Sequence, residues 1–136
     1  MAIFNGNWEI FFSENFNEYM IAIGVPDDRR QQAMQTLGDS SKMTYKISND
    51  GDNWTFGVTT SAGSRDIKFT LGTEIDTTTL DGRPLKALYT LDGNNLTEKQ
   101  TGPDFESVNV RTVDGDTMTM VMTGNGVSCT RKYKKI

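Results

Sequence analysis

The chain has 136 residues, a formal net charge of −4 and a hydrophobic content of 35%, which suits a single domain over residues 1–136 and argues against a basic surface for nucleic acid. It has no histidine and one cysteine, Cys129, so the usual Ser-His-Asp, Cys-His and histidine metal sites, thiolate metal cages and internal disulfides are excluded. The acidic residues occur mainly in turn sequences such as NDGD and VDGD, where they shape turns, and we expect neither an enzyme nor a cofactor.

The first part of the chain predicts a strand followed by two helices. Residues 4–12 have the pattern of a strand, and Ser13 is typical of a helix N-cap. Apolar residues at helical spacing follow, namely Phe16, Tyr19, Met20 and Ile23. Gly24 ends this helix, and a second one is expected from Pro26 to Gly38. Its predicted apolar side carries Ala33, Met34 and Leu37.

After Gly38 the apolar pattern changes from helical spacing to the alternation of strands. Turn sequences such as Asp81-Gly82 separate the predicted strands. These strands lie at about 42–48, 53–60, 65–71, 74–79, 84–91, 95–100, 106–113, 117–123 and 127–134. Such a meander closes most simply on itself, because closure removes its edges, and about ten strands leave space inside. The sequence therefore predicts a mostly β fold, an antiparallel up-and-down β-barrel whose open end is covered by the helix pair.

The last predicted hairpin places an arginine on an apolar strand face. Asn125-Gly126 indicates a two-residue turn, which sets the strand register. The predicted partners are Met122 with Cys129, Met120 with Arg131 and Met118 with Tyr133. A buried guanidinium needs compensation, and no acidic residue lies on this face of the hairpin. Water or an anion from outside the chain is therefore expected beside Arg131, unless it is an ordinary surface arginine.

Other positions are interpreted by pattern alone. Arg111 shares its strand face with Ser107 and Asn109, which favours exposure. Trp54 is expected near the surface. Cys129 is expected to be a packed thiol, because no base is available to activate it.

Several segments resemble the intracellular fatty-acid-binding proteins of the calycin superfamily, in particular the heart/muscle and cellular retinoic-acid-binding branch. The resemblance is carried by FNGNW, SENFNEYMIAIGV, LDGRPLKALYTLDGNNLTEKQ, VNVRTVDGD and GVSCTRKYKKI, and it runs over nearly the full length. It implies a clam-like barrel of about ten strands with a helix-turn-helix lid between the first two. It also implies reversible binding and intracellular transport of one long-chain fatty acid.

The resemblance further implies roles for particular residues. Arg131 and Tyr133 look like the pair that binds the ligand carboxylate directly, and Arg111 looks like a second arginine that acts through ordered water. Gln100 occupies a polar position that faces the cavity. The remaining cavity residues implied are Met120 and Met122 in the wall and Phe16, Tyr19 and Met20 in the lid.

Two alternatives stay open on this reading. One is a carrier of retinoic acid or another hydrophobic carboxylate; a neutral ligand such as retinol fits poorly with Arg111 in place of an amide. The other is a membrane-associating structural lipid-binding protein, although the segments 26–42 and 61–64 depart from the family beside the expected opening and make membrane contact at most transient. The start of the chain lacks a secretory signal, and no apolar run is long enough to span a bilayer. We therefore expect a soluble, cytoplasmic monomer.

Overall fold

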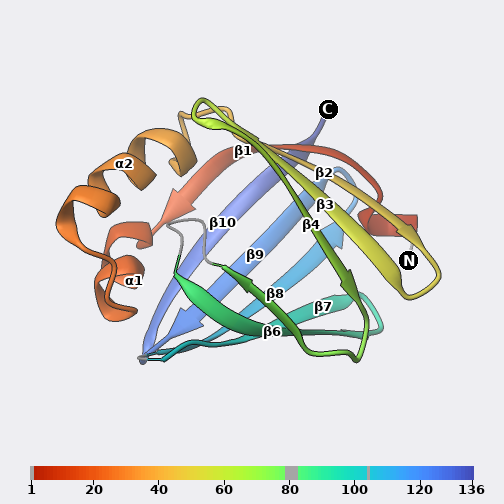
Figure 1. The fold of residues 1–136 in the computed structure, drawn as a ribbon. Helices are drawn as coiled ribbons and strands as arrows, with labels where there is room; N and C mark the ends of the chain where they lie inside the picture. The colour runs from red at the N-terminus through yellow and green to blue at the C-terminus, as the bar shows by residue number, and fades with distance from the viewer. Residues whose placement is uncertain (1, 79–82, 104) are drawn as a thin grey trace.

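Ten strands form one antiparallel sheet that curls into a nearly closed barrel (Figure 1). The computed structural model describes residues 2–78, 83–103 and 105–136. After the short helix η1 (Ala2–Phe4), the strands are β1 (Gly6–Glu14), β2 (Thr44–Asp50), β3 (Asn53–Thr60), β4 (Gly63–Thr70), β5 (Ile75–Thr78), β6 (Pro84–Asp92), β7 (Asn95–Thr101), β8 (Glu106–Asp114), β9 (Thr117–Gly124) and β10 (Val127–Lys135). The predicted mostly β barrel is confirmed, whereas residue 79 of one predicted strand and the turn Asp81-Gly82 lie outside the described residues.

Strand order explains how the sheet becomes a barrel. Each strand pairs with its neighbour along the chain except at β4 and β5, which stand at the two ends of the order, and β1 pairs with β10. The side chain of Arg65 in β4 reaches across to β5, where it donates to Thr77 Oγ1 at 3.2 Å and to the Thr78 carbonyl at 2.8 Å. Side-chain contacts therefore connect the two edges.

The register of the last hairpin is the predicted one. Met122 pairs with Cys129, Met120 with Arg131 and Met118 with Tyr133. The turn residues Asn125 and Gly126 have φ of 47° and 84°, the positive values that such a turn requires. Because strand side chains alternate, Arg131 and Tyr133 both point into the barrel, where they are 2% and 0% exposed.

The helices α1 (Phe16–Ala22) and α2 (Asp27–Leu37) lie between β1 and β2 in the chain and cover one end of the barrel (Figure 1). The chain turns between them at Gly24, whose φ is 84°. Among the described residues, none of the helices is long and apolar enough to cross a membrane. The helix pair is therefore the lid that the sequence predicts.

Two details of the helix prediction are wrong. Ser13 belongs to β1, where it pairs with Arg131, and the N-cap of α1 is Asn15 with φ of 61°. Pairing with β10 continues through Glu14, so the strand takes the residues that the capping pattern assigned to the helix. Met34 is 45% exposed, while Ala33 and Leu37 face the barrel and line its cavity.

The β9–β10 turn holds α1 on the barrel. Asn125 Nδ2 donates to the Ala22 carbonyl at 2.7 Å, which caps the end of the helix. Gly124 permits the close approach, because a Cβ there would lie 2.6 Å from Ile23 Cγ2.

An aromatic cluster fills part of the barrel, and it includes Trp54. This residue is 1% exposed, so the expectation of a surface position is wrong. Its ring meets Phe4 edge-on at 5.7 Å and stacks on Phe69 at 5.9 Å. Phe4, which the pattern assigned to the strand over residues 4–12, belongs instead to η1, and its ring helps to bury this tryptophan.

Candidate ligand-binding site

A cavity of about 140 Å³ opens between the lid and the barrel interior. That volume is roughly ten times the space that one ordered water needs. It is lined by all of the predicted wall and lid residues and by Arg111, that is by Phe16, Tyr19, Met20, Gln100, Arg111, Met120 and Met122. Arg131 and Tyr133 are not among the described lining residues; Phe16 and Leu37, which do line it, contact Arg131.

Strand β8 turns its polar face inward. Ser107, Asn109 and Arg111 are 1%, 4% and 4% exposed, whereas Val108 on the opposite face is 38% exposed. This reverses the usual alternation, in which the apolar face is buried. The exposure that pattern alone favoured for Arg111 is therefore wrong.

An ion pair faces the cavity from β7 and β8. Arg111 Nη1 lies 3.0 Å from Glu98 Oε1, and the two side chains are 5% and 6% exposed. The strand register accounts for the contact, because Glu98 pairs with Asn109 and Leu96 with Arg111, so that Glu98 and Arg111 are diagonal neighbours on one face. Burial alone would lower the pKa of the Arg111 guanidinium, but Glu98, Tyr45 and Tyr89 together outweigh burial, and the pKa is raised.

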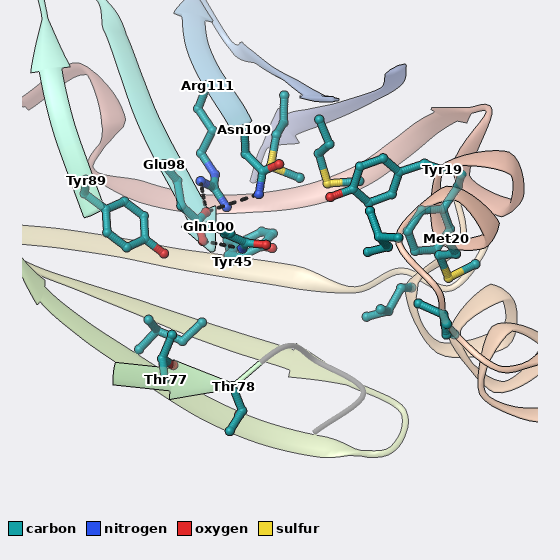
Figure 2. Close-up of a pocket in the computed structure, with 18 residues that line it drawn as sticks. Tyr19, Met20, Tyr45, Thr77, Thr78, Tyr89, Glu98, Gln100, Asn109 and Arg111 are labelled. Atoms are coloured by element: carbon teal, nitrogen blue, oxygen red, sulfur yellow. Dashed lines mark hydrogen bonds and ion pairs between the residues drawn. The ribbon is translucent and has the colours of Figure 1, made fainter. Parts of the chain in front are cut away.

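Polar neighbours complete the surroundings of Glu98. Gln100 Nε2 donates to Glu98 Oε2 at 2.5 Å, and Asn109 Nδ2 donates to Glu98 Oε1 at 3.4 Å. Figure 2 shows these side chains and Arg111 converging beside Tyr45, with Tyr89 on the same side of the cavity. We refer to Glu98, Gln100, Asn109 and Arg111 as the Glu98 cluster.

Hydrogen bonds connect this cluster with the lid. Tyr19 of α1 shares a bond of 2.5 Å with Ser107, and Ser107 Oγ donates to Asn109 Oδ1 at 3.1 Å. Asn109 in turn donates to Glu98. Burial raises the pKa of Tyr19 to about 12, so its hydroxyl remains a donor at neutral pH.

Arg131 is also buried, but its hydrogen-bond partners are uncharged. Its Nε donates to Tyr133 at 3.2 Å and its Nη1 to Ser13 Oγ at 3.2 Å, and its Nη2 donates to the Leu37 carbonyl. Its Cζ also lies 4.3 Å from the ring centre of Phe16. In the described part of the chain no carboxylate is within ion-pair distance of Arg131, so neutral acceptors alone compensate this charge.

The arginine also stabilises the end of α2. Leu37 is the last residue of that helix, whose last turn contains no basic residue. The carbonyls there carry the negative end of the helix dipole. A guanidinium at this carbonyl therefore joins the barrel wall to the lid.

Glu98 is the functional candidate that the sequence prediction missed. The signal was present, because Gln100 was placed facing the cavity and residues two apart share a strand face. Of the charged residues that the structure describes, Glu98, Arg111 and Arg131 are the buried ones. The interior thus carries a net single positive charge. The described residues contain no group of three or more His, Cys, Asp or Glu side chains that could hold a metal ion.

Comparisons with known proteins agree with this geometry. A sequence model of the lipocalin / cytosolic fatty-acid binding protein family matches residues 1–136. Sodium/calcium exchanger regulatory protein 1 of Doryteuthis pealeii is 39% identical over 132 residues, with 96% of this chain and 95% of that protein covered. The liver fatty acid-binding protein of Lethenteron camtschaticum is 38% identical over 117 residues, covering 86% of this chain and 98% of that protein.

A solved structure shares both the fold and part of the sequence. The fatty acid binding protein of Schistosoma mansoni in complex with arachidonic acid superposes with a TM-score of 0.91 at 33% identity. The match covers 100% of this chain and 98% of the other.

Proposed function

The chain belongs to the lipocalin / cytosolic fatty-acid binding protein family, and from this premise we propose that it reversibly binds one long-chain fatty acid and carries it in the cytoplasm. In this proposal the protein is a monomeric carrier and catalyses no reaction. The acyl chain lies in the cavity, where each buried methylene contributes about 0.8 kcal/mol. The carboxylate binds to Arg131 and Tyr133, while Arg111 stays in its ion pair with Glu98.

The charge of Arg131 is the observation that carries the proposal. This guanidinium is 2% exposed, and its hydrogen bonds go to neutral groups, namely a phenol, a hydroxyl, a carbonyl and the thioether of Met43. A carboxylate that replaces the Leu37 carbonyl would add an ion pair, and Tyr133 can donate to the same group. The net positive charge of the interior suits one monoanionic ligand.

The route of the ligand is proposed to pass beside α2. A second hollow lies between α2 and the β3–β4 hairpin, and its lining includes Leu37, Val58 and Ala62. Leu37 also lines the main cavity. Ligand that enters here would reach the Leu37 carbonyl and Arg131 first.

The test is the affinity of the protein for oleate after Arg131→Ala, measured by displacement of a fluorescent fatty acid. Loss of a contact to a charged group costs about 1.5–3 kcal/mol, which corresponds to a roughly ten- to hundredfold weaker Kd. Lys134→Ala is the matched control, because it removes a positive charge from an exposed position of the same strand. Unchanged oleate affinity in Arg131→Ala would refute this placement of the carboxylate.

Because Arg131 also contacts the end of α2, a second variant separates binding from folding. Tyr133→Phe keeps the buried ring, which packs edge-on against Tyr45 at 5.3 Å, and removes the hydroxyl alone. We expect a weaker affinity for oleate, by less than in Arg131→Ala. The free energy of unfolding should fall by about 1–3 kcal/mol, because Arg131 Nε loses its acceptor, while the contact of Arg131 with the end of α2 is kept.

A further inference from the structure

We propose that the cavity also binds uncharged long-chain lipids whose head group carries a hydroxyl, and that Glu98 selects them. The inference rests on the proposed function in one respect, since the cavity must be a lipid site. It concerns the cavity end formed by the Glu98 cluster, whereas the fatty carboxylate is assigned to Arg131 and Tyr133.

The Glu98 cluster, which a lipid head group would contact at this end of the cavity, has no net charge. Glu98 and Arg111 both line the cavity and form an ion pair at 3.0 Å. Gln100 and Asn109 add amides on the same wall. The uncompensated guanidinium, Arg131, is not among the described residues that line this cavity, so its charge does not alter that balance directly.

A carboxylate is a poor guest beside this pair. To reach Arg111 it would have to approach within hydrogen-bonding distance of the guanidinium that already holds Glu98. Two carboxylates at one buried guanidinium repel each other strongly, because the low dielectric of the interior does little to screen them. Glu98 therefore directs a fatty acid away from Arg111 and towards Arg131.

A hydroxyl fits the same place without a change in charge. It can donate to a carboxylate oxygen and accept from a guanidinium at the same time. Glu98 Oε2 accepts from Gln100 and a carboxylate oxygen has room for a further donor, while Arg111 uses Nη1 for Glu98 and a guanidinium has five donors. The ion pair thus offers a hydroxyl both an acceptor, Glu98, and a donor, Arg111.

This reverses an expectation that the sequence alone supported. An arginine at position 111, where an amide would suit a neutral ligand, argues against such a ligand, because an unpaired buried charge would face an uncharged head group. Glu98 removes that objection, since the charge of Arg111 is compensated before any ligand arrives.

The experiment compares oleate with oleyl alcohol, which share a hydrocarbon chain and differ in the head group. Each competes for the delipidated full-length protein against a fluorescent fatty acid whose Kd is measured separately for every variant. We expect both to bind the wild type. In Glu98→Gln, which keeps the shape and removes the charge, oleyl alcohol should bind about tenfold more weakly and oleate about tenfold more tightly.

Two further variants guard the interpretation. Glu106→Gln removes a carboxylate from an exposed position at the start of β8 and should change neither affinity. Glu98→Gln combined with Arg111→Gln restores an uncharged cavity wall. Oleyl alcohol should therefore bind to this double variant more tightly than to Glu98→Gln. The double variant also replaces Glu98→Gln in the test if the single variant does not fold.

The outcomes separate the two proposals. Opposite changes for the two ligands in Glu98→Gln support the role of Glu98, whereas parallel losses overturn it. If the wild type binds oleate but not oleyl alcohol, this inference fails and the proposed fatty acid function stands. Binding of neither ligand would refute the proposed function itself.

Discussion

The interior holds two guanidiniums that burial does not distinguish but whose surroundings differ. Arg111 and Arg131 are 4% and 2% exposed, and both face inward from neighbouring parts of the sheet. Arg111 has a carboxylate at 3.0 Å, whereas Arg131 donates to a phenol, a hydroxyl and a carbonyl. Burial of an arginine therefore does not by itself show how its charge is compensated, and the nature of its acceptors must be known as well.

The two sites also contact the lid in different ways. Arg131 reaches α2 through the Leu37 carbonyl and α1 through the ring of Phe16. The Glu98 cluster reaches α1 through Asn109, Ser107 and Tyr19. A ligand that changes the contacts of Arg131 would therefore act on both helices, whereas one at the Glu98 cluster would act first on α1.

Removal of Glu98 should have the largest effect on stability. Glu98→Met leaves Arg111 buried without its carboxylate, and the loss of one partner from such a pair costs about 3–5 kcal/mol in the free energy of unfolding. Glu98→Met with Arg111→Met removes both charges and should return close to the wild-type value, because apolar replacement of a whole buried pair is often neutral. Urea unfolding of the single and double variants measures both values.

The loss of stability in Arg131→Met tests whether the two guanidiniums differ as their acceptors predict. Its partners are neutral, so their loss should cost only about 1.5–3 kcal/mol, clearly less than Glu98→Met. Equal losses in the two variants would mean that the acceptors around the two guanidiniums do not matter for stability.

The hairpin that carries Arg131 could be predicted from the sequence because its register is local. Asn125-Gly126 fixes the pairing of Arg131 with Met120, and alternation then decides which side chains are buried. The barrel and the lid follow from the same local signals, the turn sequences and the change of spacing after Gly38.

The ion pair of Glu98 with Arg111 could not be predicted in this way because it depends on contacts between strands. The buried face of β8 is polar, so local alternation points to the wrong side. The contact of Glu98 with Arg111 further requires the β7–β8 register, and Gly102-Pro103 between these strands marks a turn without setting the register as a two-residue Asn-Gly turn does. Ser13 and Trp54 were misjudged for the same reason, since β10 and η1 determine their surroundings.

Tyr45 lies between the two sites and can report on both. Its ring is 5.8 Å from Arg111 Cζ and meets Tyr133 edge-on at 5.3 Å. Burial raises the pKa of Tyr45 to about 12, against about 10 in an unfolded chain. Its contribution to stability is therefore full below pH 10 and is lost as the pH rises towards 12, by about 1.4 kcal/mol at pH 11.

Tyr45→Phe should remove that share of the alkaline loss, and urea unfolding at pH 9 and pH 11 measures it. Arg111 and Arg131 both hold the pKa of Tyr45 down, so Arg131→Met should move the tyrosinate absorbance transition to higher pH. The same alkaline loss in wild type and Tyr45→Phe would contradict a raised pKa for this residue.

Tyr19→Phe should have the smallest effect and tests whether the Glu98 cluster is joined to α1. The change removes the hydroxyl that bonds to Ser107 at 2.5 Å and should cost about 1 kcal/mol in the free energy of unfolding. Because Asn125 still caps the helix at Ala22, α1 should stay docked, with faster hydrogen exchange of its amides. Ser107→Ala should then cost less in the Tyr19→Phe background than alone, since both residues belong to one hydrogen-bonded chain. Additive losses would show instead that the lid and the ion pair are independent, and that the interior acts on the helices through Arg131, which contacts the Leu37 carbonyl and the Phe16 ring.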